Sequence, residues 1–376
     1  MDTKYSEKQT TSAPIKNKIS DPVRLPGKKY FAVLVITVIL LLAFTVSFFA
    51  VFSMPGQGLP YKPQSSSGDK EFSGGNSNSQ GGNNSSGSVI GGGLSVGGNA
   101  PGKTMAKRSS YKISTAQNVK YMTDSIRADQ AILVDLDSYT SIAEKGADTK
   151  IYPASMTKVM SMLVACERLK SLKTKLTVTK DISDYAYRMG GSQFGVKVGD
   201  ELTTQDLLYL TSYYSDTVAV IMLANHIAGS EEKFVDMMNE KAKALKLSNT
   251  NFDNCTGLHS SDNYTTCREM AVIMAYALEN PLCKELLTST AAYKLKTNSN
   301  TYTLWGPSWY RDRLSSKPNL ETVKVSGGKT GYIDESGYCL VSYAVGKSSG
   351  KKYVQVVVGE KSPGSDAKYI YNNYVN

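Results

Sequence analysis

The sequence is built around Pro153-Ala154-Ser155-Met156-Thr157-Lys158-Val159-Met160, where an apolar run follows a serine and a lysine. On a helix, residues three apart lie on one face, with Cβ atoms about 5–6 Å apart. Lys158 can then take the hydroxyl proton of Ser155 as that oxygen attacks a carbonyl carbon. A serine nucleophile needs such a base. The alternative is that Ser155 only caps the helix, since serine is a favoured N-cap residue.

Ser-x-x-Lys occurs eight times in the chain, so this spacing alone does not single out Ser155. The residues that follow Ser155 do. Apolar side chains after Ser155 cover most of a helix surface, which predicts a helix buried all round: Met156, Val159, Met160, Leu163, Val164 and Cys166. Polar groups at the start of a buried helix are costly. We therefore interpret Ser155 and Lys158 as functional residues.

The first 110 residues differ in composition from the rest of the chain. Residues 1–29 are polar and basic, and residues 30–52 contain no charge, glycine or proline. As a helix, this apolar run is roughly 34 Å long, enough to cross the ~30 Å hydrocarbon core. It is too long for a cleaved signal peptide, and its basic flank favours a cytoplasmic N-terminus. Residues 53–110 are rich in glycine, serine and asparagine, which predicts a disordered linker.

We therefore expect a cytoplasmic tail (1–29), a transmembrane anchor (30–52), a linker (53–110) and an extracytoplasmic domain (111–376). The expected location is the cell membrane, with a single span. In the domain, strand candidates precede Ser155 and recur near the C-terminus, with helices between them. After Pro281 the pattern turns to strands. This order predicts an α/β (α+β) fold in which helices flank an antiparallel sheet and form a mostly helical lobe. The strand candidates are 131–135, 138–143, 338–344 and 353–358, and a last surface helix is expected at 365–375.

Local signals place several helix ends within this domain. Thr203 to Leu208 reads as a capped helix start, Gly229 ends an apolar helix, and Ser230 caps an amphipathic one. Thr266 and Glu269 have the spacing of a capping box. The tetrapeptide Ser348-Ser349-Gly350-Lys351 predicts a hairpin between the last two strands.

Cysteine and histidine usage narrows the chemistry. The five cysteines are widely spaced, and no pair has zinc-finger spacing. Cys166 and Cys339 lie in apolar runs and are expected in the core, while a disulfide among Cys255, Cys267 and Cys283 stays open. With only His226 and His259 in the chain, a Ser-His-Asp triad is hard to assemble, which favours lysine as the base. We expect no metal and no cofactor.

The formal net charge of +10 partly reflects the basic tail. For an exported domain, a basic surface suits an anionic cell-wall polymer or lipid, and we expect no nucleic-acid partner. A solvated basic face without a function explains the charge equally well.

A lysine base must be neutral, which burial and a nearby cation both favour. Two further stretches can complete such a site. Ser215-Asp216-Thr217 lies in a polar loop between two apolar helices, so Ser215 is a candidate proton relay or else a helix cap. Lys329-Thr330-Gly331 lies among glycines, which allow a ligand to come close. Its alternative is a glycine-rich turn with an exposed lysine.

Together, these three motifs occur in the order S-x-x-K, S-D-N and K-T-G of penicillin-binding proteins. The domain resembles the serine-type D-alanyl-D-alanine carboxypeptidases, the low-molecular-mass penicillin-binding proteins. The likeness extends over most of 116–376 and includes Gly190-Gly191-Ser192, Asn251-Phe252 and Thr256-Gly257-Leu258-His259. It implies a penicillin-binding-protein/β-lactamase-like fold.

The resemblance also implies the role of each site residue. Ser155 would be the nucleophile, Lys158 its general base and Ser215 the proton relay to the departing D-alanine. Lys329 and Thr330 would bind the terminal carboxylate of a peptidoglycan stem peptide. The backbone N–H groups of Ser155 and of Tyr332, which follows Gly331, would form the oxyanion hole. β-Lactams would acylate Ser155.

One departure from the family pattern is Thr217, where the family usually has an asparagine that touches the substrate. Losing such a contact costs about 1–3 kcal/mol. An alternative reading is therefore a weakly active or inactive relative that binds peptidoglycan or β-lactams as a sensor or scaffold. A further alternative is a β-lactamase, which in class A uses an additional glutamate-bearing loop that we do not find between Ser215 and Lys329.

Overall fold

The computed structural model describes residues 111–122, 125–307, 320–360 and 363–375. The predicted tail, anchor and linker, residues 1–29, 30–52 and 53–110, lie outside this part of the chain. None of the helices within the described ranges is both long enough and apolar enough to span a membrane.

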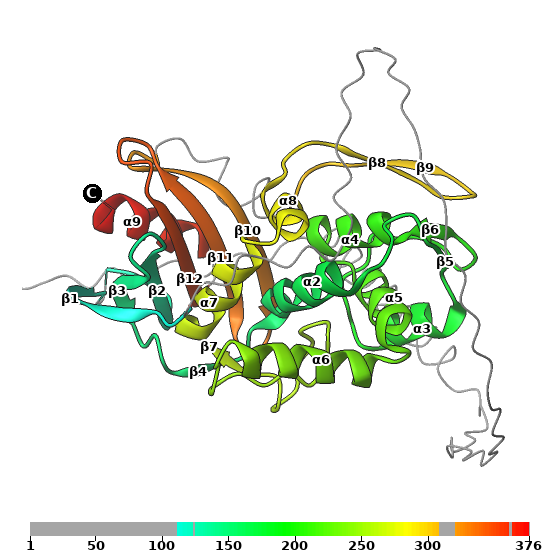
Figure 1. The fold of residues 1–376 in the computed structure, drawn as a ribbon, viewed down its shortest axis with the longest axis horizontal. Coiled ribbons are helices and arrows are strands. Elements are labelled where there is room, and N and C mark those ends of the chain that lie inside the picture. The colour runs from blue at the N-terminus through cyan, green and yellow to red at the C-terminus, as the bar shows by residue number, and fades with distance from the viewer. Residues whose placement is uncertain (1–110, 123–124, 308–319, 361–362, 376) are drawn as a thin grey trace, which may run out of the picture. The chain divides into compact units, whose positions relative to one another are not determined.

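A six-stranded sheet joins the two ends of the domain (Figure 1). Its spatial order is β1-β3-β2-β12-β11-β10, and the central pair β2 and β12 is antiparallel, with Val134 opposite Val354. The strands are β1 (Ser114–Tyr121), β2 (Gln130–Asp135), β3 (Thr140–Lys145), β10 (Val323–Ile333), β11 (Gly337–Gly346) and β12 (Lys352–Glu360). The prediction of a sheet built from both ends is confirmed. The sheet is not wholly antiparallel, however, because β1 pairs with β3 in parallel.

Both faces of this sheet are covered. On β12, Val354 and Val356 face a large core shared with the helices, while Val357 faces a smaller core. Helix α9 (Pro363–Tyr374) covers the smaller core and buries Ile370 and Tyr371 there. Helix α7 (Cys267–Ala277) lies on the opposite face (Figure 1). The predicted last helix therefore exists, and its inner face is part of the core.

The remaining helices form a lobe beside strand β10 (Figure 1). At its centre, α2 (Thr157–Arg168) buries every residue from Thr157 to Cys166, as the apolar run predicted. Around it lie α3 (Lys180–Arg188), α4 (Thr204–Tyr213), α5 (Thr217–Ala228), α6 (Glu231–Ala244) and α8 (Pro281–Thr288). Three two-stranded antiparallel sheets complete the described part: β4 (Lys150–Ile151) with β7 (Thr265–Thr266), β5 (Lys175–Thr177) with β6 (Glu201–Thr203), and β8 (Tyr293–Lys296) with β9 (Thr301–Leu304).

Most predicted helix ends are confirmed. Thr203 and Asp206 form a full capping box at α4, Ser230 caps α6, and Gly229 ends α5 with a φ of 87°. The predicted turn to strands after Pro281 is confirmed from β8 onward, although Pro281 itself begins helix α8, which the pattern did not predict. Proline suits the first helical position, where its missing N–H has no partner to lose.

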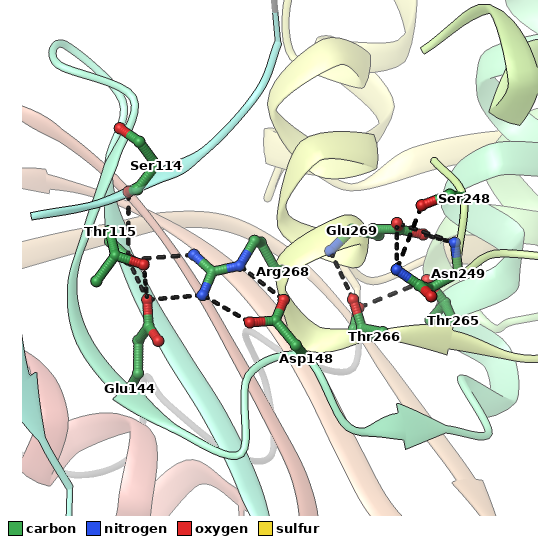
Figure 2. A network of polar contacts seen from close by, with 11 residues as sticks. Ser114, Thr115, Glu144, Asp148, Ser248, Asn249, Thr265, Thr266, Arg268 and Glu269 are labelled. Atoms are coloured by element: carbon green, nitrogen blue, oxygen red, sulfur yellow. Dashed lines mark hydrogen bonds and ion pairs between the residues drawn. The ribbon is translucent and has the colours of Figure 1, made fainter. Parts of the chain in front are cut away.

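Arg268 links helix α7 to strand β3 (Figure 2). Its Nη2 donates to Glu144 Oε1 at 2.9 Å and to Asp148 Oδ2 at 3.0 Å, and its Nε donates to Asp148 Oδ1 at 2.8 Å. The Arg268 side chain is only 15% exposed. The largely buried Arg268 guanidinium therefore connects the start of α7 to the sheet.

The residue after Arg268 corrects one prediction. Thr266 Oγ1 accepts the Glu269 N–H at 3.1 Å, which is one half of the expected capping box. The Glu269 carboxylate instead accepts the Asn249 N–H at 3.0 Å and the Thr250 hydroxyl at 2.6 Å. Figure 2 shows the Asn249 side of this arrangement. Glu269 therefore anchors the loop after α6 rather than closing the box.

All five cysteines are free and buried. Cys166 and Cys339 are core residues, as predicted. The disulfide that the sequence left open among Cys255, Cys267 and Cys283 is not formed.

Candidate active site

Ser155 lies in a single 3-10 turn, Ala154–Met156, directly before helix α2. Met156 is the N-cap residue of α2, and no side chain caps this end. The alternative that Ser155 serves only as a helix cap is therefore wrong. Its side chain is half-buried at the boundary between the helical lobe and strand β10.

Lys158 lies one turn further along α2 and is 1% exposed. Its Nζ is 3.2 Å from Ser155 Oγ and donates to the Thr256 carbonyl oxygen at 2.6 Å. Burial lowers the pKa of Lys158 to about 8, against the opposing charges of Asp216 and Glu231. A lysine in this state gives up its proton close to neutral pH and can act as a base.

Ser215 lies between α4 and α5, with its backbone in the left-handed region at a φ of 57°. The capping role belongs to its neighbour, because the Asp216 carboxylate accepts the N–H groups of Ala219 at 2.7 Å and Phe194 at 2.6 Å. The alternative of Ser215 as a cap is therefore wrong. Its hydroxyl instead accepts a hydrogen bond from Lys329 Nζ at 3.0 Å.

Lys329 is on strand β10 and is 2% exposed, so the alternative of an exposed lysine in a glycine-rich turn is also wrong. Its Nζ donates to the Thr330 carbonyl oxygen at 2.8 Å. Burial and the neighbouring charge of Lys158 hold the pKa of Lys329 well below its usual range. The two lysines form an electrostatically coupled pair, in which a proton on one disfavours a proton on the other.

Two glycines hold the Ser155 turn from opposite sides. A Cβ atom on Gly331 would lie 2.9 Å from the Ser155 nitrogen, so strand β10 reaches the turn only because this residue has no side chain. A Cβ atom on Gly257 would lie 1.9 Å from the Ala154 carbonyl oxygen, and Gly257 has a φ of 78°. Sequence reasoning assigned a site role to Gly331. Gly257 appeared there only within the family resemblance.

Tyr332 follows Gly331 and is 52% exposed. Its hydroxyl donates to Asp334 Oδ1 at 2.7 Å. It lines a cavity of about 710 Å³ together with Tyr152, Asp334 and Glu335. Strand β10 is the last strand of the sheet within the described residues. The edge of β10 thus adjoins the Ser155 turn, and Tyr332 joins this edge to the cavity.

Thr217 is the first residue of helix α5, and its side chain is as buried as those of the two lysines. It is 1% exposed, and among the described residues its hydroxyl has no hydrogen-bond partner. A Cβ atom on Gly191 would lie 2.5 Å from Thr217 Oγ1, and the Thr217 N–H donates to the Ser192 carbonyl oxygen at 2.8 Å. The segment 190–192 therefore covers it, and a contact between Thr217 and substrate stays a prediction.

Sequence reasoning missed the role of the turn at 254–257. Asn254 Oδ1 accepts from the Thr256 N–H at 3.2 Å, the Thr256 hydroxyl at 2.9 Å and the Gly257 N–H at 2.7 Å. An asparagine three residues before a glycine is a turn signal. Spacing alone did not reveal that this turn supplies the carbonyl oxygen that contacts Lys158.

Fold and site together place a serine hydroxyl beside a buried lysine amine, an arrangement that suits acyl transfer. The sequence model of the D-alanyl-D-alanine carboxypeptidase family, Peptidase_S11, matches residues 115–362, and the chain belongs to this family. The predicted family and fold class are thereby confirmed.

Known proteins similar to this chain include two D-alanyl-D-alanine carboxypeptidases and the solved structure of a DD-transpeptidase. D-alanyl-D-alanine carboxypeptidase DacF of Bacillus subtilis is 34% identical over 244 residues, which are 63% of this chain and 58% of the relative. The carboxypeptidase of Streptomyces sp. strain K15 is 32% identical, over 62% of this chain and 82% of that protein. The crystal structure of the Streptomyces K15 DD-transpeptidase aligns with a TM-score of 0.59 at 27% identity, covering 67% of this chain and 98% of that one. The match with the Bacillus relative thus spans less than two thirds of that protein's length.

Proposed function

We propose that this protein is a serine-type D-Ala-D-Ala carboxypeptidase that removes the terminal D-alanine from peptidoglycan stem peptides. The observation that carries this proposal is the buried Lys158 amine, 3.2 Å from Ser155 Oγ, with its pKa lowered to about 8. A buried lysine with a lowered pKa beside a serine hydroxyl is a nucleophile with its base in place.

In the first step, Ser155 Oγ attacks the carbonyl carbon of the penultimate D-alanine, and Lys158 takes the hydroxyl proton. The backbone N–H groups of Ser155 and Tyr332 stabilise the oxyanion that forms. A donor of this kind contributes about 3–4 kcal/mol of transition-state stabilisation. The close approach of Gly331 to the Ser155 nitrogen brings these two backbone segments together.

In the second step, the bond between the carbonyl carbon and the nitrogen of the terminal D-alanine breaks. Ser215 gives its hydroxyl proton to the departing amine and regains the proton that Lys158 took from Ser155. Lys329 and Thr330 bind the carboxylate of that residue. A carboxylate beside Lys329 favours the charged form of Lys329, and this in turn favours the neutral form of Lys158. The substrate itself therefore helps to keep the base neutral. Water then hydrolyses the ester on Ser155, whereas a β-lactam leaves Ser155 acylated.

The geometry of β10 sets the direction of the substrate. An extended peptide adds to the edge of a sheet through main-chain hydrogen bonds. With its carboxylate at Lys329 and Thr330 and its reacting carbonyl beside Gly331, the stem peptide continues past Tyr332. Its preceding residues then enter the cavity that Asp334 and Glu335 line.

We also propose that residues 30–52 anchor the protein in the cell membrane, with residues 1–29 in the cytoplasm and the catalytic domain outside. The 23 uncharged residues of this run and its basic flank support the proposal. Protease added to intact spheroplasts should then digest the domain and spare the tail. Digestion that requires lysis would contradict this orientation.

Release of D-alanine from diacyl-L-Lys-D-Ala-D-Ala by the purified protein tests the activity. We expect release by the wild type and none by Ser155→Ala. Ser348→Ala is the matched control, because Ser348 is an exposed serine that also precedes a lysine by three residues. Labelling by a fluorescent penicillin without D-alanine release would instead favour the sensor or scaffold reading, which the buried Thr217 supports.

A further inference from the structure

Behind the Ser155 turn, a carboxylate holds the chain that contacts Lys158. We propose that Glu231 is a positioning residue for the Ser155–Lys158 pair and that it acts through the turn at 254–257. The inference rests on the proposed function, in which Lys158 is the base for Ser155. Glu231 itself need not touch the substrate in this role.

The first link is between Glu231 and Cys255. Glu231 is the first residue of helix α6, where a carboxylate is favoured by the helix dipole. Its Oε1 accepts the Cys255 backbone N–H at 3.1 Å and the Cys255 thiol at 3.2 Å. Cys255 is fully buried, so both donors depend on this one oxygen in place of water.

The second link runs from Cys255 to helix α2. The Cys255 carbonyl oxygen accepts the Ser161 hydroxyl at 2.7 Å, and the Thr256 carbonyl oxygen accepts Lys158 Nζ at 2.6 Å. Lys158 and Ser161 are three residues apart and lie on one face of α2. The turn is thus fixed along α2 at two points, with Glu231 bonded at its far side.

The orientation of the Lys158 amine follows from this arrangement. A carbonyl oxygen can only accept, so Lys158 must direct one N–H toward Thr256. A neutral amine has two N–H groups and one lone pair, and fixing one N–H restricts where the lone pair can point. With Ser155 Oγ 3.2 Å away, the Thr256 carbonyl aims the lone pair at the hydroxyl proton. Moving this carbonyl would leave the amine near Ser155 but wrongly oriented.

Glu231 also contributes charge. The titratable groups that face Lys158 are Asp216 before α5, Lys329 on β10, Cys255 in the turn and Glu231 on α6. The negative charge of Glu231 raises the pKa of Lys158, against the larger effect of burial. Removing this charge while keeping the oxygen therefore lets Lys158 lose its proton at lower pH.

The test is the acylation rate with a fluorescent penicillin, measured against pH on the full-length protein in detergent. In the wild type we expect the rate to rise with pH through about 8, as Lys158 loses its proton. Glu231→Gln keeps the acceptor oxygen and should shift this rise to lower pH by about half a unit. Glu231→Ala also removes the acceptor and should slow acylation by roughly tenfold or more at every pH.

Glu232→Gln is the matched control, since Glu232 is the next residue of α6 and is exposed. We expect it to leave both the rate and the pH profile unchanged. Equal shifts in Glu232→Gln and Glu231→Gln, or a wild-type profile in Glu231→Gln, would overturn the inference. If Glu231→Gln does not fold, Glu231→Asp is the deciding variant, because it keeps the charge but shortens the side chain. We expect it to slow acylation without shifting the pH profile. A wild-type acylation rate in Glu231→Asp would contradict the inference. A wild type that is not acylated at Ser155 would refute the proposed function rather than this inference.

Discussion

Ala154 and Ser215 both have positive φ angles, of 48° and 57°, although neither is a glycine. Ala154 precedes the proposed nucleophile, Ser155, and Ser215 is the proposed proton relay. A non-glycine residue in this region costs of order 1–3 kcal/mol and persists only where its surroundings impose it. Here Gly257 packs on the Ala154 carbonyl, and the Asp216 cap fixes the residue after Ser215. At the scale of single residues, the site therefore stores backbone strain at two of its positions.

Ser215→Gly should separate stability from activity. Glycine relieves the strain but loses more chain entropy on folding, so the free energy of unfolding should stay within about 1 kcal/mol of wild type, on the stabilising side. Loss of the hydroxyl that bonds Lys329 should slow D-alanine release by about a hundredfold or more. Urea denaturation and the release assay measure the two effects.

Ser215→Ala is the control for this variant, because it removes the hydroxyl but keeps the strained Cβ. It should lose as much activity without any gain in stability. Near wild-type release by either variant would remove Ser215 from the mechanism.

Thr217→Val tests whether the buried hydroxyl is used. Valine has nearly the same shape, and the hydroxyl that it removes has no partner among the described residues. Losing a buried, unsatisfied polar group should raise the free energy of unfolding by about 1 kcal/mol. Acylation by a fluorescent penicillin should stay within about twofold of wild type, because the side chain is covered by segment 190–192.

Thr211→Val provides the contrast in the same lobe. The Thr211 hydroxyl is equally buried but donates to the Leu207 carbonyl oxygen at 2.8 Å, so its loss should destabilise the fold by about 1 kcal/mol. A tenfold fall in acylation by Thr217→Val would contradict the covered geometry and favour the predicted substrate contact.

At the scale of elements, stability depends on how the helices are fixed to the sheet. Arg268 joins α7 to Glu144 on β3 and to Asp148 in the following loop (Figure 2). Strand β7 directly precedes α7 and pairs with β4, and β4 leads into the Ser155 turn. The placement of Ser155, the proposed nucleophile, is thus connected through short segments to this ion-paired junction.

Arg268→Lys should weaken this junction. Lysine keeps the charge but cannot reproduce a planar fork bound to two carboxylates. Because the Arg268 side chain is 15% exposed and its partner Glu144 10%, we expect the free energy of unfolding to fall by about 1–3 kcal/mol in urea denaturation. Arg188→Lys, at an exposed position of helix α3, should change it by less than about 0.5 kcal/mol. Equal effects of the two substitutions would show that the fork contributes little.

Local patterns predicted the elements that local interactions determine. Thr203, Ser230 and Gly229 end their helices through bonds or backbone angles within a few residues, so their signals survive in the sequence. Strand β1 carries no such signal, because its polar residues are mostly exposed and do not alternate. It forms by pairing with β3, which sequence periodicity does not report.

At the scale of the whole molecule, the same limit applies to the site. The three motifs and their order were enough to predict Ser155, Lys158, Ser215 and Lys329 as site residues. The fold brings these residues together. The contacts of Gly191 with Thr217 and of Glu231 with Cys255 join segments far apart along the chain. No spacing rule predicts them, because they exist only after the helices of the lobe have packed around α2.

The five buried thiols have a practical consequence for the folded domain. No cysteine is presented to solvent, so a maleimide or disulfide reagent meets no reactive group until the core opens. Each thiol then becomes a reporter of the opening of its own neighbourhood: Cys166 and Cys283 for the helical lobe, Cys267 for the start of α7, Cys339 for the sheet, and Cys255 for the turn that contacts Lys158. Because the buried thiols do not react in the folded protein, a dye would label an engineered surface cysteine at that one position alone.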